Sequence, residues 1–426
     1  MKLVSKAALA TVLAIGASAV MTTAPVEAQR NKKEEAKPAA PKITEAFRVP
    51  ALAADTAATA KDIPTAEAQF ALANAAVSNE DERFINEQIR LKIGELKKDP
   101  AWVSQALDYL MTSPKTTPEN LAAYNFSRGM AALNQKKPAE ALPFLRKARE
   151  LGYPDPNLPL KLGTALIDSG DVEGGVAEID TAVKATKASG QPVPDTWYRY
   201  AYGKLQAANK PQAANAWIRR LVSDYPKPEN WRTMLLTYRQ TQASGDTPAA
   251  RNQRIDLYRL MRATNALAGE ADYIIYADEA SRLGLRHEAV AVIEEGQRTG
   301  KIPAGNADAK SILASAKQGI ATDSSLASLE KEGRGAQNGR LAALAANGFM
   351  AQGQAAKAVE LYQLALQKGG VEEPQTRLRL GIAQAQAGDM AAAKTSFTAL
   401  NGTPMAELAA FWTLYLDTKA GTPAAA

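Results

Sequence analysis

The sequence predicts an all-α protein built as a stack of small helix pairs, and three observations lead to this prediction. First, a pattern of small and large apolar residues recurs every 34 residues, so that Gly129 matches Gly163 and Leu145 matches Ile179. Second, from Pro64 onward the apolar residues recur at helical spacing, and alternation at period two never persists. Third, a chain of 426 residues exceeds one ordinary globular core, so it divides into domains or grows by repeating a unit.

The composition agrees with close-packed helices. Alanine is abundant, aromatic residues make up 6% of the chain and cysteine is absent, so stability must come from packing without disulfides. The formal net charge is +6, but the basic residues are scattered and no basic stripe with interleaved aromatics occurs. We therefore expect no nucleic-acid partner.

Residues 1–28 have the pattern of a cleavable signal peptide. Lys2 and Lys6 precede an apolar run over residues 7–20, and Val26 and Ala28 are small residues at the two positions that a signal peptidase recognises. The run is short for a membrane anchor, which is the alternative, so we expect no stable membrane insertion after signal removal. The expected product begins near Gln29 and is periplasmic or secreted, because the short, Ala-rich signal resembles those of Gram-negative bacteria.

The segments around the helical body have a different composition. Residues 29–63 are charged and contain prolines, so we expect a disordered linker there. Residues 64–121 show helical periodicity, interrupted at Pro100 and Pro114, and are expected to form an N-terminal helical cap. Residues 420–426 are expected to be a flexible tail.

The repeat is defined by three positions in a unit numbered from Ala122. Positions 8 and 20 are Gly or Ala, because two antiparallel helices that cross closely leave no room for more, and position 24 is usually a large apolar residue. One helix pair cannot bury its apolar face alone, so pairs must stack. Six units carry the pattern, and in each the residues are given in the order 8, 20 and 24: Gly129, Ala141 and Leu145; Gly163, Gly175 and Ile179; Ala201, Ala213 and Trp217; Ala277, Ala289 and Ile293; Ala346, Ala358 and Tyr362; Gly381, Ala393 and Phe397.

This pattern resembles the tetratricopeptide repeat (TPR), and the chain is similar to a secreted bacterial TPR protein. The resemblance implies a right-handed superhelical α-solenoid of TPR-like helix–turn–helix repeats. It covers residues 122–269, including a degenerate unit from residue 228 with an insertion in its turn, residues 270–304, and residues 339–419, which end in a C-terminal helix. Residues 305–338 match poorly and are expected to form an atypical helical pair. A related helical solenoid and an ordinary Ala-rich bundle are the alternatives.

The sequence offers few candidates for catalysis. His287 is the single histidine, and without cysteine there is no thiol nucleophile and no Cys/His metal cluster. Acidic pairs such as Glu294 and Glu295 are adjacent, so on a helix they point apart. We therefore expect no enzyme, no metal site and no cofactor.

The TPR resemblance also implies where a partner binds. The first helix of each unit lines a concave face, and two central units would bring together the candidate peptide-binding residues Tyr198, Arg199, Tyr202, Arg232 and Arg239. Tyrosine offers contact area at low entropy cost and arginine donates in pairs to carboxylates, so an acidic or C-terminal peptide segment is the expected ligand. The alternative is that the two tyrosines only pack against the neighbouring unit.

The carboxylate clamp of some family members is missing, since Phe126, Ser127 and Met130 occupy its positions in the first unit. The sequence therefore predicts a non-catalytic interaction scaffold or assembly factor of the bacterial cell envelope, with a protein or peptide partner. A periplasmic TPR subunit of a polysaccharide-export or secretion machine is the alternative. A third hypothesis is a hydrolase in the N-terminal helices or a small-molecule binding role, and the scarcity of His and Cys argues against the catalytic form.

Overall fold

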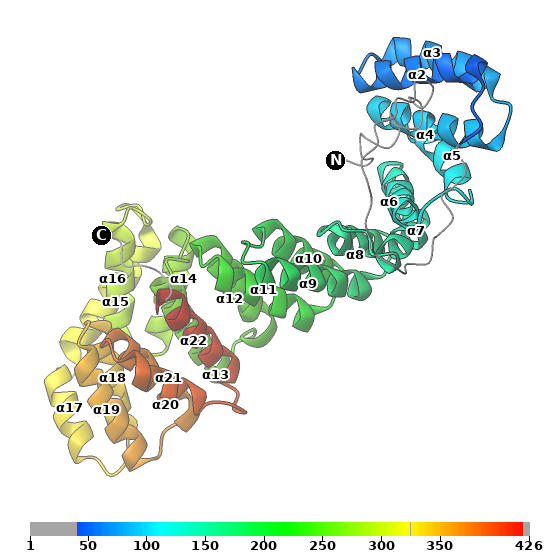
Figure 1. The fold of residues 1–426 in the computed structure, drawn as a ribbon. Coiled ribbons are helices and arrows are strands. Elements are labelled where there is room, and N and C mark those ends of the chain that lie inside the picture. Colours follow the sequence, from blue (N-terminus) through cyan, green and yellow to red (C-terminus); the bar gives the residue numbers. More distant parts are fainter. Residues whose placement is uncertain (1–40, 324, 421–426) are drawn as a thin grey trace, which may run out of the picture. The chain divides into compact units, whose positions relative to one another are not determined.

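The computed structural model describes residues 41–323 and 325–420, and the regular structure in these ranges is entirely α-helical (Figure 1). Two compact units, Met1–Trp197 and Tyr198–Ala426, divide the chain inside α10 (Asp195–Ala207). The predicted all-α class is confirmed. The predicted signal peptide, the first part of the predicted linker over residues 29–40 and the tail over residues 421–426 lie outside the described residues.

The first unit consists of consecutive helix pairs. Most of these helices begin with a proline in the first turn, where the missing N–H would have no partner within the helix, or after an Asp, Asn or Thr whose side chain accepts from the first turn. The pairs are α2 (Glu45–Thr59) with α3 (Ile63–Ala76), α4 (Glu80–Lys97) with α5 (Pro100–Leu110), α6 (Pro118–Asn134) with α7 (Pro138–Glu150), and α8 (Leu158–Asp168) with α9 (Val172–Ala188).

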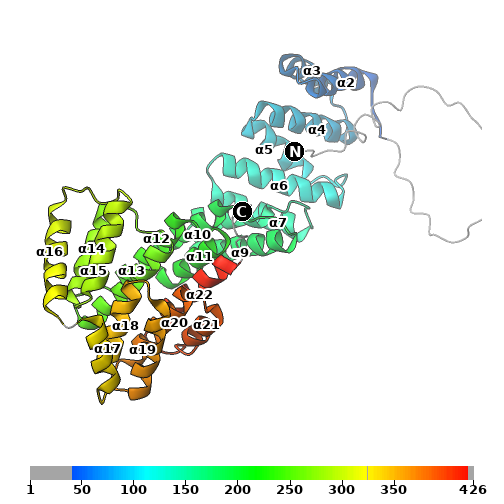
Figure 2. The same cartoon turned by 90° about the vertical axis from the view of Figure 1, so that its left-hand side faces the viewer.

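The second unit continues the pairing, but the atypical pair predicted over residues 305–338 does not pack as a pair, because α16 contacts α14 and α15 whereas α17 contacts α18 (Figure 2). Its helices after α10 are α11 (Pro211–Asp224), α12 (Pro228–Gln242), α13 (Pro248–Ala263), α14 (Glu270–Arg282), α15 (Arg286–Arg298), α16 (Ala307–Thr322), α17 (Leu326–Gly335), α18 (Arg340–Ala351), α19 (Ala355–Lys368), α20 (Glu373–Gln386), α21 (Met390–Thr398) and α22 (Ala406–Ala420).

The helices of a pair touch at the predicted small residues. A Cβ atom added to Gly163 would lie 2.6 Å from the carbonyl oxygen of Gly175 and 2.8 Å from Cγ1 of Ile179. A Cβ added to Gly129 would lie 2.7 Å from Leu145, and one added to Gly381 would lie 2.5 Å from Phe397. Positions 8, 20 and 24 therefore meet as the repeat requires, and the fold is TPR-like.

The turn inside each regular pair contains one residue with positive φ, which lies seven residues after position 8 and five before position 20. This left-handed conformation favours glycine, and most of these positions carry it. The residues are Lys136 (φ 59°), Gly170 (φ 102°), Gly284 (φ 72°), Gly353 (φ 75°) and Gly388 (φ 91°).

The same landmark corrects the predicted register of the pair α10–α11. Its turn residue is Asn209 (φ 55°), so position 20 is the buried Ala214, whereas the predicted Ala213 is exposed. Position 24 is accordingly Ile218 in place of the neighbouring Trp217, whereas position 8 stays at Ala201, which is fully buried. The prediction was wrong because α10 carries one more residue between its buried alanine and the turn than the other first helices do.

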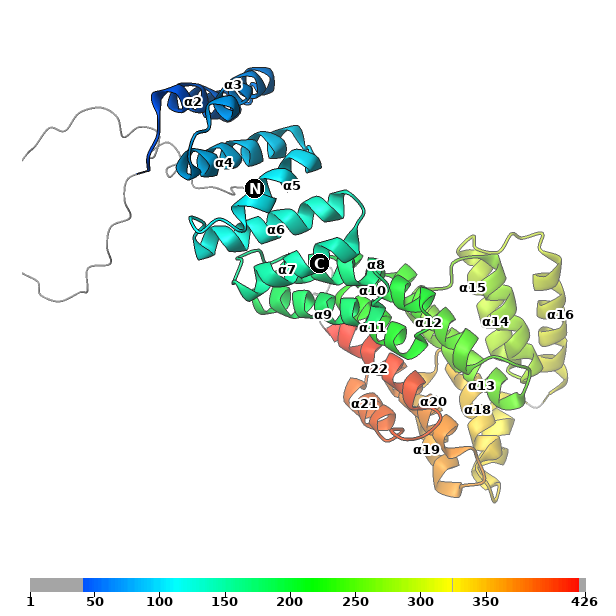
Figure 3. The same ribbon diagram turned by 90° about the vertical axis from the view of Figure 1, so that its right-hand side faces the viewer.

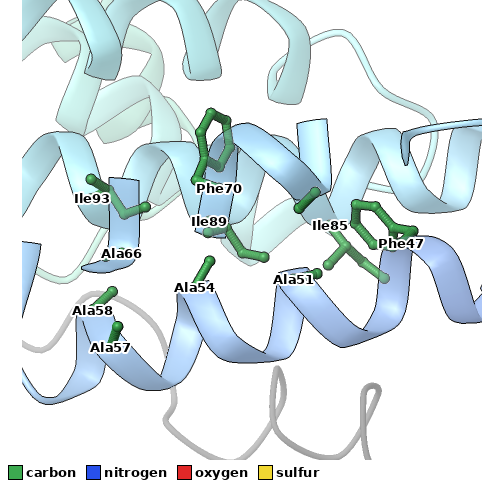
Figure 4. Close-up of a cluster of buried hydrophobic side chains, with 11 residues drawn as sticks. Phe47, Ala51, Ala54, Ala57, Ala58, Ala66, Phe70, Ile85, Ile89 and Ile93 are labelled. Carbon is green, nitrogen blue, oxygen red and sulfur yellow. The ribbon is translucent and has the colours of Figure 1, made fainter. Parts of the chain in front are cut away.

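The predicted linker is also wrong in its described part, because residues 45–59 form α2. With Lys61 (φ 64°) as the turn residue, α2 and α3 place Ala54, Ala66 and Phe70 at positions 8, 20 and 24. Figure 4 shows the inner face of α2, with Phe47 and Ala54, against the isoleucines of α4. The composition argument failed here because alanine supplies most of the buried face and Pro50 lies inside the helix.

The second unit contains one helix that is buried on all sides. Residues 254–261 of α13 are all buried, and side chains of α12, α14, α15, α18, α20 and α22 are among those that contact α13. The C-terminal helix α22 lies alongside α11, α20 and α21 (Figure 3) and contacts α12 through Trp231 with Tyr415 and Tyr238 with Phe411. This unit therefore has a shared core in addition to its pairwise contacts.

Candidate functional site

The candidate site is the surface that the first helices α10 and α12 present, here called the α10–α12 surface. Four of the five predicted residues lie on it with at least part of the side chain exposed. Its members are Arg199, Tyr202, Arg232, Leu236 and Arg239. Hydrogen bonds run across the two helices, from Arg199 Nη2 to Asn230 Oδ1 at 2.7 Å and between the hydroxyls of Tyr202 and Thr237 at 3.0 Å.

The fifth predicted residue, Tyr198, lies inside the fold. Its side chain is fully buried, packs near the ring of Trp217, and donates its hydroxyl hydrogen to Asp224. Burial raises the pKa of Tyr198 far above its usual value, and the neighbouring Asp224 carboxylate adds to the effect. This placement agrees with the packing alternative for Tyr198, whose hydroxyl serves the stability of the unit.

The two arginines of α12 differ in how their charge is compensated. Arg232 forms an ion pair with Asp272, which is 8% exposed, and its Nη1 also donates to the Ala266 carbonyl at 3.3 Å. This guanidinium is therefore held by the protein itself and is not simply solvated. Arg239 instead donates to the neutral hydroxyl of Tyr258 at 2.8 Å, and burial raises the pKa of that tyrosine, so it stays protonated. Arg239 is the better anchor for a carboxylate on this surface.

A second, unexpected feature is that first helices of the C-terminal repeats contact a helix of the same chain. Asn347 is at position 9 of its unit and Arg379 at position 6, both on first helices. Asn347 Oδ1 accepts from Arg259 of α13 at 3.3 Å, and Arg379 Nε donates to Asp256 of α13 at 3.0 Å. Both first helices, α18 and α20, thus direct polar side chains at α13.

The contacts of α13 include a buried cluster with balanced charge, here called the α13 cluster: Asp256, Arg259, Glu288 and Arg379. Arg259 pairs with both oxygens of Glu288 at 2.8 and 2.6 Å and with Asp256 at 2.7 Å. Burial alone would lower the pKa of Arg259, but Glu288 and Asp256 outweigh it and raise that pKa. Burial likewise acts to raise the pKa of Glu288, yet Arg259 holds it below its usual value.

Sequence reasoning missed the α13 cluster, although one signal was available. The stretch RIDLYRLM, residues 254–261, carries large apolar residues on every side of a helix, which is the pattern of a helix without a solvent face. Charged residues within such a stretch need buried partners, and positions 6 and 9 in the first helices of later units supply two of them, Arg379 and Asn347.

His287 lies half-buried at the start of α15, with its Nδ1 3.5 Å from Gln352 Nε2. Burial lowers its pKa, while Asp323 acts in the opposite direction. It borders a hollow of about 430 Å³ whose other lining residues include Leu326, Leu329 and Leu344. The described part of the chain shows no group of three or more His, Asp or Glu placed to hold a metal ion. None of the described helices has the length and apolar character needed to cross a membrane.

No protein-family model and no curated protein matches the sequence. Solved structures with a likeness include the apo quorum sensor NprR from B. thuringiensis, with 12% identity, a TM-score of 0.28, and coverage of 82% of this chain and 96% of that one. The TPR2AB domain of yeast Sti1 in its complex with a pHSP90 has 12% identity, a TM-score of 0.24, and coverage of 70% and 98%. The pentatricopeptide repeat protein PPR10 from maize has 15% identity, a TM-score of 0.29, and coverage of 84% and 54%.

Proposed function

We propose that this protein is a non-catalytic interaction scaffold that binds a protein or peptide segment on its first-helix faces. The observation that carries the proposal is the α10–α12 surface, where an aromatic, an aliphatic and three arginine side chains lie on neighbouring helices. Partly exposed tyrosine and leucine give apolar contact area, and arginine gives directed hydrogen bonds to carboxylates. The fold supports the idea a second way, because α18 and α20 already contact a helix of the same chain.

The ligand that suits this surface is a short extended segment with an acidic side chain or a free C-terminal carboxylate. Arg239 supplies positive charge, whereas the charge of Arg232 is largely compensated by Asp272. Leu236 and the ring of Tyr202 lie on the same surface and suit an apolar side chain next to the carboxylate. A free carboxylate is therefore expected to bind better than its amide.

The test uses fluorescence polarisation of a peptide library in which each peptide occurs with a free and with an amidated C-terminus. Arg239→Gln should weaken binding of the best acidic peptides about tenfold, the size expected for one lost charge-assisted hydrogen bond. Leu236→Glu should weaken it further. Arg298→Gln, on the exposed last turn of α15, is the matched control. Arg232→Ala is a poor probe, because it would leave the buried Asp272 without its cation.

Equal binding by the parent, Arg239→Gln and Leu236→Glu would exclude the α10–α12 surface as the binding site. The surface of the insertion at residues 244–251 would then be examined next. If no peptide binds at any practical concentration, folded proteins take the place of peptides as the expected partner class.

The cellular setting is proposed from the sequence alone. Residues 1–28 support export to the periplasm or beyond, and an assembly role in the cell envelope follows from that setting. Crosslinking in intact cells would distinguish this role from the alternative, since recovery of one large export or secretion complex would favour a subunit of such a machine. N-terminal sequencing that finds Met1 on cytoplasmic protein would exclude the exported forms of both.

A further inference from the structure

The face of the α2–α3 pair that points away from α4 lacks the polar covering that the end of a repeat stack normally needs. Val49 is 57% exposed, Leu52 40% and Leu72 58%, and they are three of the six exposed large apolar side chains among the described residues. Val49 and Leu52 are three residues apart on α2, so they share a face. Leu72 lies seven residues after Thr65, on the same side of α3.

This face is shallow and open, and small residues form its centre. A hollow of about 510 Å³ lies over α2 and the start of α3, and three alanines are among its lining residues. The full lining consists of Arg48, Val49, Leu52, Ala53, Thr56, Ala57, Ala60, Asp62 and Thr65. Alanines at the centre allow another helix to approach closely, as the repeat itself requires between its own helices.

The charges on this face are arranged so that it complements itself. Arg48 lies at one end of the lining and Asp62 at the other, with Ala53 and Thr56 between them. When two copies of α2 lie antiparallel about a twofold axis, the basic end of each meets the acidic end of the other. Arg48 also contacts Glu45 of its own helix at 3.5 Å, but both side chains stay at least partly exposed, so Arg48 is accessible to Asp62 of another copy.

We propose that the α2–α3 face is a homotypic interface, in which two copies of this chain associate with their α2 helices antiparallel and Arg48 of each copy beside Asp62 of the other. The apolar residues between the ends then leave water together. The nine lining residues and Leu72 make ten residues on each copy, fewer than the roughly 20–30 residues a side of a standard stable interface. The expected association is therefore weak, with a Kd of about 10–100 µM.

Single introduced cysteines give a direct test, because the chain has no cysteine of its own. Thr56 lies near the twofold axis of the proposed dimer, so Thr56→Cys should form a disulfide- or bismaleimide-linked dimer whose yield rises with protein concentration. Leu344→Cys, at a residue that is 41% exposed on α18, is the matched control. Adding Leu52→Glu to the Thr56→Cys chain should reduce its crosslinking at least about tenfold.

Charge reversal provides a test that does not depend on crosslinking. Arg48→Glu alone and Asp62→Lys alone should each be monomeric in sedimentation velocity, because like charges then meet at both ends. A mixture of the two variants should dimerise, because each basic end again meets an acidic end. Asp62 also caps α3 through Thr65 N at 3.2 Å, so Asp62→Lys can lower the stability of α3, but recovery in the mixture excludes misfolding as the cause.

Two results would overturn the proposal. One is a Thr56→Cys chain that crosslinks no faster than the Leu344→Cys chain at 200 µM. The other is a parent chain that stays monomeric at that concentration while Leu52→Glu leaves its sedimentation unchanged. The second result would mean that the face is open to solvent or covered by residues of the same chain.

Discussion

At the scale of single residues, Glu82 shows how one buried carboxylate fixes the start of the first helix pair. Its oxygens accept four hydrogen bonds, from the backbone N–H and hydroxyl of Thr44 at 2.7 and 2.6 Å and from those of Ser78 at 2.7 and 2.7 Å. Burial acts to raise the pKa of Glu82, but the four donors outweigh it and lower the pKa from 4.5 to about 2. The carboxylate therefore ties the residues before α2 to those before α4.

The lowered pKa predicts how the stability of this pair depends on pH. Because the folded-state pKa lies below the unfolded-state value, Glu82 stabilises the fold at pH values above about 4.5, and that contribution disappears as the pH falls towards 2. Hydrogen exchange of the α2 amides between pH 2 and 6 should show this loss of protection. In Glu82→Gln the loss should be much smaller, and at pH 7 the variant should be about 1–3 kcal/mol less stable.

The exposed Glu119 in the first turn of α6 gives the control for this experiment. Glu119→Gln should leave both the stability and its pH profile close to those of the parent. If the stability of Glu82→Gln depended on pH as that of the parent does, the four hydrogen bonds would not be the cause of a lowered Glu82 pKa.

At the scale of the helix pair, the contact at positions 8 and 20 sets the distance between the helices. Gly163→Ala would place a methyl group against the Gly175 carbonyl and Ile179, so the pair α8–α9 must open. We expect a loss of about 1–3 kcal/mol in urea unfolding. Gly203→Ala in α10 is the matched control, since a Cβ there meets nothing within 4 Å, and it should stabilise the helix by about 0.5–1 kcal/mol. Equal effects of the two changes would mean that helix propensity, and not the close contact, decides the result.

The sequence was sufficient to predict the packing of five of the six proposed pairs because the spacing of Gly, Ala and one large residue is set by local geometry. The sequence-based prediction failed where the position or burial of a side chain depends on other parts of the chain. The pattern placed Ala213 at position 20, but one added residue before Asn209 moved that role to Ala214. Composition suggested a linker where Phe47 and Ala54 are buried, because the isoleucines that cover them lie about 35 residues later in α4.

The candidate site was predicted in the same uneven way. Arg199, Tyr202, Arg232 and Arg239 lie on neighbouring first helices, as the repeat geometry requires. The sequence could not show that Asp272 compensates the charge of Arg232 or that Asp224 accepts a hydrogen bond from the Tyr198 hydroxyl. Both carboxylates belong to later helices, and their position relative to the site depends on how the helices stack.

At the scale of the whole chain, the two units are organised differently. In the first unit the helices contact the next one or two helices along the chain, as in an open stack. In the second unit α13 contacts helices more than 100 residues later, through Arg379 and through α22. Energetic coupling follows contact, so we expect the first unit to open locally and the helices around α13 to open together.

The α13 cluster should be the point at which this coupling is most easily measured. Asp256→Ala leaves Arg259 and Arg379 buried with one carboxylate between them, and removing one partner of a buried charge pair costs about 3–5 kcal/mol. Native-state hydrogen exchange should therefore show lost protection in α13, α18, α20 and α22 at once, although Asp256 contacts only some of them. Asp278→Ala, which removes the exposed partner of Arg282, should change protection by less than about 0.5 kcal/mol. Loss of protection confined to α13 in Asp256→Ala would show that its surrounding helices are stable without it.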